Sequence, residues 1–182
     1  MYKKFITAIF PQNKHEKIAW LLMIFIMVAT LILDLWSKFA VMQNFKLYES
    51  REVIPDFFSL TYVTNPGAAW GLLAGKQYLL LLISLIVFVC CLIFIRKLTE
   101  NFIERYIAIG LLFAGILGNS FDRLYHGEVI DFLDCYIVMN NHAYHWPIFN
   151  IADIAICCGT GLFVLSSLVR KENKELTDKK IS

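Results

Sequence analysis

Four long apolar runs dominate this sequence and constrain its fold more than any other feature. They cover residues 18–36, 77–95, 102–121 and 147–169. The first and fourth runs each hold one charged residue, an aspartate, and the second holds none. Because a bilayer core requires about 20 mostly apolar residues per helix, the sequence predicts four transmembrane helices over these ranges.

The composition excludes the main alternatives to a membrane protein. Hydrophobic residues make up 58% of the 182 and charged residues 18%, whereas an ordinary soluble domain has about 45–50% and about 25%. A compact chain of this length buries too small a fraction of its surface to hide so many apolar side chains. The net charge of +2 is too small for a nucleic-acid partner. We therefore expect one integral membrane domain over residues 1–182.

The distribution of basic residues predicts the orientation. The segment before the first run has four Lys or Arg, the 96–105 connection three and the segment after the fourth run five, whereas the other side has five in total. The positive-inside rule therefore predicts that both termini are cytoplasmic and that the two longer connections face outward. The first run is longer than a signal-peptide core and lacks a small-residue cleavage site, so we interpret it as a permanent helix.

The two outward connections contain more than simple linkers. Residues 52–64 are rich in β-branched and aromatic residues and are followed by Asn65-Pro66-Gly67, a pattern that predicts short strands and a turn. Residues 122–146 carry several aromatic and apolar residues. We expect this second connection to lie at the membrane interface.

Asp34 and Lys38 are charged residues at the outer end of the first run, where charge is costly to insert. Their spacing of four residues places the side chains next to each other on a helix. The pair is therefore interpreted either as a structural ion pair or as a pair that positions a substrate.

Asp153 and Asp131 are the strongest candidates for chemistry. Asp153 lies near the outer start of the fourth run, with Asn150 one turn before it; we expect it about two turns into the helix, too deep for an N-cap, although structural capping remains the alternative. Asp131 stands between Val129-Ile130 and Phe132-Leu133, and an apolar frame raises a carboxyl pKa. Two such carboxyls at one membrane depth indicate an aspartyl-protease pair, in which one activates water and the other supplies a proton.

Other polar residues give weaker indications. Asp122 and Arg123 form a simple charge pair at the end of the third run or belong to the same cluster as Asp131 and Asp134. His142 and His145 have a spacing that metal ligands use, but no accompanying ligand motif, so interfacial histidines are the favoured interpretation. The five cysteines show no disulfide or zinc pattern, and we expect neither a metal nor a cofactor.

Several short motifs are similar to those of the bacterial lipoprotein signal peptidase (signal peptidase II) family. They are DLWSK at 34–38, NPGAAWG at 65–71, GNSFDR at 118–123, GEVIDF at 127–132 and FNIAD at 149–153. These blocks occur in the family's order and the resemblance covers roughly residues 18–170. It implies an all-α membrane protein, with four transmembrane helices, a small extracytoplasmic β-cradle and an interfacial helix.

The resemblance also implies an activity. The family's members are intramembrane aspartyl endopeptidases of the inner membrane that cleave diacylglyceryl-modified prolipoproteins just before the lipidated cysteine, at the outer face. They are inhibited by globomycin, and the precedent is a monomer in contact with membrane lipid. The implied catalytic pair is Asp131 and Asp153. The implied substrate-binding or supporting residues are Asp34, Lys38, Asn65, Gly67, Asn119, Asp122, Arg123 and Asn150.

Two other classes of protein remain open from the residues alone. A small proton-coupled transporter also carries aspartates within its spans, although it more often has inverted repeats, which this sequence lacks. A non-enzymatic membrane assembly factor explains four spans but not a buried carboxyl pair. Solute flux in proteoliposomes, measured against cleavage of a lipidated peptide, separates these classes.

Overall fold

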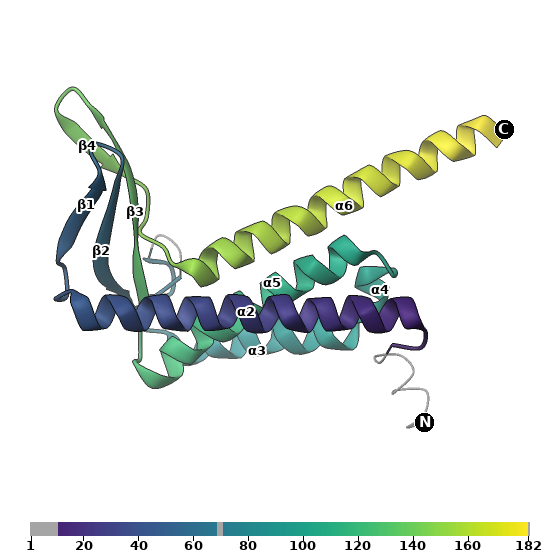
Figure 1. The fold of residues 1–182 in the computed structure, drawn as a ribbon, viewed down its shortest axis with the longest axis horizontal. Helices are drawn as coiled ribbons and strands as arrows, with labels where there is room; N and C mark the ends of the chain where they lie inside the picture. The colour runs from purple at the N-terminus through teal and green to yellow at the C-terminus, as the bar shows by residue number, and fades with distance from the viewer. Residues whose placement is uncertain (1–10, 69–70, 182) are drawn as a thin grey trace.

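The protein is a helix bundle with a small antiparallel sheet at one end. The computed structural model describes residues 11–68 and 71–181 (Figure 1). Its long helices are α2 (Lys14–Asn44), α3 (Gln77–Ile93), α5 (Ile103–Tyr125) and α6 (Ile151–Ile181), and the short α4 (Ile95–Thr99) follows α3. In Figure 1, α2 begins and α6 ends at the end of the molecule away from the sheet.

Three of the helices, α2, α5 and the 151–171 part of α6, are long and apolar enough to cross a membrane. The fourth apolar helix, α3, has 17 residues, which is at the lower limit for a span. Apolar side chains on α2 face outward without a protein partner: Leu21 is 68% exposed and Phe25 is 69% exposed. Because helices of this length that expose so many apolar side chains require a lipid environment, the chain is an integral membrane protein.

The central helix of the bundle is α5, which packs against α2, α6 and α3. Small residues allow these close approaches, as is usual for helices in membranes. A Cβ at Gly115 would collide with the backbone of α6 at Ala152, and one at Gly110 would lie 2.7 Å from the Met23 carbonyl oxygen on α2. The tight contacts fix α2 and α6 on either side of α5.

The sheet contains four strands in the order β1-β2-β3-β4, and all of its pairs are antiparallel. The strands are β1 (Ser50–Ile54), β2 (Phe58–Asn65), β3 (Val129–Met139) and β4 (His142–His145). The prediction of strands and a turn over 52–67 is confirmed by β1 and β2. The 122–146 connection contains β3 and β4, which the sequence analysis did not predict.

The predicted start of the fourth span at residue 147 is wrong, because α6 begins at Ile151. Phe149 instead forms a bridge with Leu133 of β3, so residues 146–149 run beside β3 before the helix begins. An apolar run alone does not distinguish a buried strand partner from a helix. Within residues 11–68 and 71–181, the only helix outside the four long ones is the five-residue α4, so the interfacial helix stays a prediction.

Candidate active site

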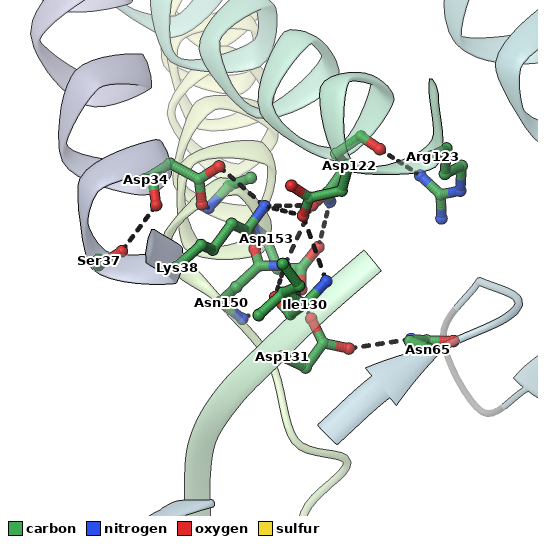
Figure 2. A network of polar contacts seen from close by, with 12 residues as sticks. Asp34, Ser37, Lys38, Asn65, Asp122, Arg123, Ile130, Asp131, Asn150 and Asp153 are labelled. Atoms are coloured by element: carbon green, nitrogen blue, oxygen red, sulfur yellow. Dashed lines mark hydrogen bonds and ion pairs between the residues drawn. The ribbon is translucent and has the colours of Figure 1, made fainter. Parts of the chain in front are cut away.

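At the centre of the site, Lys38 holds two aspartates together. Its Nζ lies 2.8 Å from Asp34 Oδ2 and 2.7 Å from Asp122 Oδ2, and all three side chains are almost completely buried. Figure 2 shows the amine between carboxylates from α2 and α5. The predicted Asp34–Lys38 pair is therefore confirmed, and Asp122 joins it as a second counter-ion. Removing the Lys38 charge would leave two carboxylates unpaired in a dry environment.

The two buried aspartates, Asp34 and Asp122, connect this group to the start of α6 and to the sheet. Asp34 Oδ1 accepts a hydrogen bond from the amide of Ala152, in the first turn of α6, at 2.8 Å. Asp122 Oδ2 accepts one from the amide of Ile130 on β3 at 3.2 Å. These two amides could not be predicted from the sequence, because backbone donors are present at every residue and only tertiary packing selects them.

Asp131, on β3, is held from two sides by amide groups. Asn65 Nδ2 at the end of β2 donates to Oδ2 at 3.0 Å, and Asn150 Nδ2 donates to Oδ1 at 2.7 Å. Burial of the carboxyl, with the charge of Asp153 adding to it, raises the pKa of Asp131 to about 7. The prediction that apolar neighbours raise this pKa is confirmed, and Asp131 is suited to carry a proton at neutral pH.

Asp153 lies in the first turn of α6, not about two turns in as the sequence analysis predicted. Its amide donates to Asn150 Oδ1 at 2.9 Å, while the Asn150 amide donates to Asp153 Oδ2 at 3.2 Å. This reciprocal arrangement is a capping box, which stabilises the helix start. The capping alternative is thus correct for Oδ2, but Oδ1 is also engaged and accepts from Asn119 Nδ2 at 2.8 Å.

Asn119 and Asn150 join the ion pair to the two aspartates. Asn119 Oδ1 accepts from Lys38 Nζ at 3.2 Å and from Asn150 Nδ2 at 3.0 Å. Asn150 is completely buried, and its Nδ2 also lies 3.2 Å from the carbonyl oxygen of Ile130. Because an amide both donates and accepts, these two residues carry a continuous hydrogen-bond chain from Lys38 to Asp131 and Asp153.

Arg123 fixes the loop after β2. Its Nη2 donates to the Gly67 carbonyl at 2.8 Å and its Nη1 to the Asn119 carbonyl at 3.3 Å, while the Gly67 amide donates to Asn65 Oδ1 at 3.0 Å. The interpretation of Asp122 and Arg123 as a simple pair is wrong, because Asp122 pairs with Lys38 instead. Two residues of the NPGAAWG motif, at 69 and 70, lie outside the described part of the chain.

A cavity of about 540 Å³ opens beside this network. Its polar lining includes Asn65, Asn119, Arg123 and Asp153. Its apolar lining comes from residues 146–149 and from Ile154, Ile156, Cys157 and Cys158 on α6. The site therefore combines a polar end, where the half-buried Asp153 meets the cavity, with an apolar wall.

The structure brings all ten site residues of the sequence analysis into one network, and it leaves three other candidates outside. Asp134 contacts Thr61 and His145 rather than the aspartates of the network. His142 is exposed, and across residues 11–68 and 71–181 no three His, Cys, Asp or Glu side chains are arranged to hold a metal ion. The wall at 146–149 was not predicted as part of the site, since its residues resembled the start of a helix.

Comparison with known proteins places this arrangement in a family. The sequence profile of signal peptidase (SPase) II matches residues 26–169. The lipoprotein signal peptidase of Haemophilus ducreyi is 39% identical over 168 residues, which cover 88% of this chain and 98% of that protein. The Haemophilus influenzae lipoprotein signal peptidase is 42% identical, covering 82% of this chain and 86% of the other.

Solved structures agree with the sequence relationship. A bacterial membrane enzyme determined by the in meso method at 2.3 Å is 38% identical, with a TM-score of 0.76, over 84% of this chain and 90% of its own. A second bacterial membrane enzyme, at 1.9 Å, is 39% identical with a TM-score of 0.71, over 80% and 92%. The chain belongs to the signal peptidase II family, and it is thus a protease held in the membrane by apolar helices.

Proposed function

We propose that this protein is an aspartyl endopeptidase that removes the signal peptide from diacylglyceryl-modified prolipoproteins, cutting just before the lipidated cysteine. The observation that carries the proposal is the hydrogen-bond chain that joins Asp131 and Asp153 next to an apolar-walled cavity. The relatives named lipoprotein signal peptidase support the choice of substrate.

The two aspartates have different surroundings, and this difference assigns their roles. Asp131 is 2% exposed and its raised pKa of about 7 favours the protonated form. Asp153 lines the cavity. In the proposed mechanism Asp153 removes a proton from a water molecule, whose oxygen attacks the scissile carbonyl carbon, while Asp131 gives its proton to the carbonyl oxygen. The gem-diol intermediate then collapses: one of its hydroxyls returns a proton to Asp131, the C–N bond breaks and the leaving amine takes the proton from Asp153.

The supporting residues keep the pair oriented. Asn119 and Asn150 position the two carboxyls, and the Asp34–Lys38–Asp122 group fixes α2, α5 and the start of α6 beneath them. Asn65, Gly67 and Arg123 line the cavity, where the substrate backbone would bind. Orientation of reacting groups contributes strongly to enzymatic rates, so a rigid buried network suits this chemistry.

The apolar wall matches a lipidated substrate. Removing an acyl chain from the bilayer costs about 0.8 kcal/mol per CH₂, so a diacylglyceryl group stays in lipid and the substrate reaches the site laterally. We place the enzyme in the bacterial inner membrane as a monomer, with both termini cytoplasmic, the active site near the outer face and globomycin as an expected inhibitor. The basic residues before residue 18, near α4 and after Val169 support this orientation.

The test uses the purified full-length protein in lipid and two forms of one prolipoprotein, with and without the diacylglyceryl group. We expect cleavage of the lipidated form, with a product mass that places the cut directly before the modified cysteine, and globomycin should prevent it. Cleavage of both forms at equal rates would contradict the proposed substrate. No cleavage of a verified lipidated substrate, with solute flux in proteoliposomes, would support the transporter instead.

A further inference from the structure

A second polar cluster lies on the sheet, outside the network of the proposed catalytic pair. Asp134 on β3 is 4% exposed, three residues after Asp131. Its Oδ1 lies 2.7 Å from His145 Nδ1 on β4, and its Oδ2 accepts from Thr61 Oγ1 on β2 at 2.9 Å. Since an ionised carboxylate only accepts, His145 Nδ1 is the donor. Asp134 therefore joins three strands through its side chain.

His145 is held by packing as well as by this hydrogen bond. Its ring stacks on Tyr136, with 4.7 Å between the centroids. The Tyr136 hydroxyl donates to Glu52 on β1 at 2.9 Å and accepts from Ser59 on β2 at 3.3 Å. The imidazole thus has a fixed position, although its side chain is 49% exposed.

His145 stands directly before the apolar wall of the cavity. Residues 146–149 line that cavity, and they are attached to β3 at two points. At the first, the Trp146 amide donates to the Cys135 carbonyl at 2.8 Å; at the second, Phe149 and Leu133 exchange hydrogen bonds of 3.2 and 2.8 Å. The first point adjoins His145, and the second adjoins Asn150.

We propose that Asp134 and His145 are positioning residues that fix the apolar wall at 146–149 for substrate binding. This inference rests on the proposed function. The second attachment point is secured by Asn150, which contacts Asp131 and Asn119, and it does not depend on His145. The β3–β4 ladder, which pairs His145 with Tyr136, still holds the backbone there, so loss of the Asp134–His145 contact loosens the start of the wall without releasing it, while the proposed catalytic pair stays in place. The expected effect is on the KM for the lipidated substrate and not on kcat.

The main variant is His145→Phe, which keeps a ring to stack on Tyr136 but removes the donor to Asp134. Because the variant loses a hydrogen bond to a buried carboxyl, we expect KM to rise about tenfold with kcat within about twofold. His145→Asn restores a donor near the Nδ1 position and should return KM close to the wild-type value. His142→Phe is the matched control, because His142 lies on the same strand and is exposed; we expect no change.

A second readout is independent of cleavage. Hydrogen exchange of the Trp146 amide should become faster in His145→Phe and stay unchanged in His142→Phe and His145→Asn. The inference is overturned if His145→Phe leaves both KM and this exchange unchanged, or if it lowers kcat with KM unaltered. Failure of the proposed function looks different, since the wild-type protein would then not cleave the lipidated substrate, while the exchange result would still decide whether His145 fixes the wall.

Discussion

The two ends of the helix bundle use charge in different ways. At the end near the sheet, Asp34, Lys38 and Asp122 are at most 1% exposed and contact one another directly. At the other end each ion pair has a member that reaches the surface: Arg170 and Glu104 are both about one third exposed, and the buried Glu16 pairs with Arg96, whose side chain is 31% exposed. Buried charge is expensive and exposed ion pairs contribute little, so a protein retains the first kind where it has a use. The difference indicates where function is concentrated.

The other end also differs in the partners of its charges. Arg105 donates to Ser166 Oγ and to the Leu98 carbonyl, and it pairs with Glu100, whose side chain is 60% exposed. These contacts join α5 to α4 and α6 without leading to a cavity that holds an aspartate pair. They stabilise the bundle, whereas the network near the sheet positions two carboxyls.

The largest effect in this comparison is expected for Lys38→Met, which removes the cation between two buried aspartates. Breaking a buried ion pair costs about 3–5 kcal/mol, and we expect a loss of that size in the free energy of unfolding, measured in detergent. Lys17→Met is the matched control, since Lys17 is an exposed lysine of the same helix. A Lys38→Met protein as stable as the Lys17→Met protein would show that the buried charges are not coupled.

Asn119→Ala tests the link between the ion pair and Asp153. Without the amide, Asp153 Oδ1 loses a hydrogen bond of 2.8 Å. A hydrogen bond to a charged group is worth roughly 1.5–3 kcal/mol, so kcat should fall by about 10- to 100-fold. The control is Asn44→Ala, at an exposed asparagine at the end of α2. An unchanged kcat in Asn119→Ala would remove Asn119 from the orienting chain.

The pH dependence of stability tests the environment of Asp131. Its pKa rises from 3.8 in the unfolded chain to about 7 in the folded protein, so the folded state holds the proton more tightly. The contribution of protonated Asp131 to the free energy of unfolding is therefore fully present below about pH 4, and it is lost as the pH rises towards 7. Between pH 5 and 8, the wild-type Tm should fall by at least about 2 °C more than that of Asp131→Asn. Equal changes would mean that burial does not penalise the Asp131 charge.

The smallest effect is expected for Arg170→Ala at the other end. The Glu104–Arg170 pair is partly exposed, and Arg170 also packs over the ring of Phe102. We expect a loss of up to about 1 kcal/mol in stability and no change in cleavage. A loss as large as that of Lys38→Met would show that the two ends of the bundle contribute equally.

The sequence predicts the site better than the elements that build it. Asp34 and Lys38 were paired correctly because helical spacing is a local property. The start of α6 was misplaced, and β3 and β4 were missed, because strand pairing such as Phe149 with Leu133 depends on residues distant in the chain. The capping role of Asp153 was underestimated for the same reason: its depth in the helix follows from where the strand partner ends.

The proposed catalytic pair was predicted from the apolar frame of Asp131 and the position of Asp153, and Asn150 was noted one turn before Asp153. Asn65 and Asn119 came only from the family resemblance. Nothing in the composition distinguishes Asn65, Asn119 and Asn150 from other asparagines. Their shared feature is spatial, since β2, α5 and α6 bring them to the same carboxyls. Asp134 shows the limit of reasoning from clusters, because it lies close in sequence to Asp131 yet contacts a different set of residues.

The most direct test of the central claim is cleavage of a diacylglyceryl-modified prolipoprotein by Asp131→Asn and Asp153→Asn. Asp56→Asn is the matched control, at an exposed aspartate in the turn between β1 and β2. We predict that each dyad variant loses at least about 10²- to 10⁴-fold in rate while remaining folded in the membrane, and that Asp56→Asn cleaves like the wild type. Near-normal cleavage by either Asp131→Asn or Asp153→Asn would contradict the assignment of the catalytic pair.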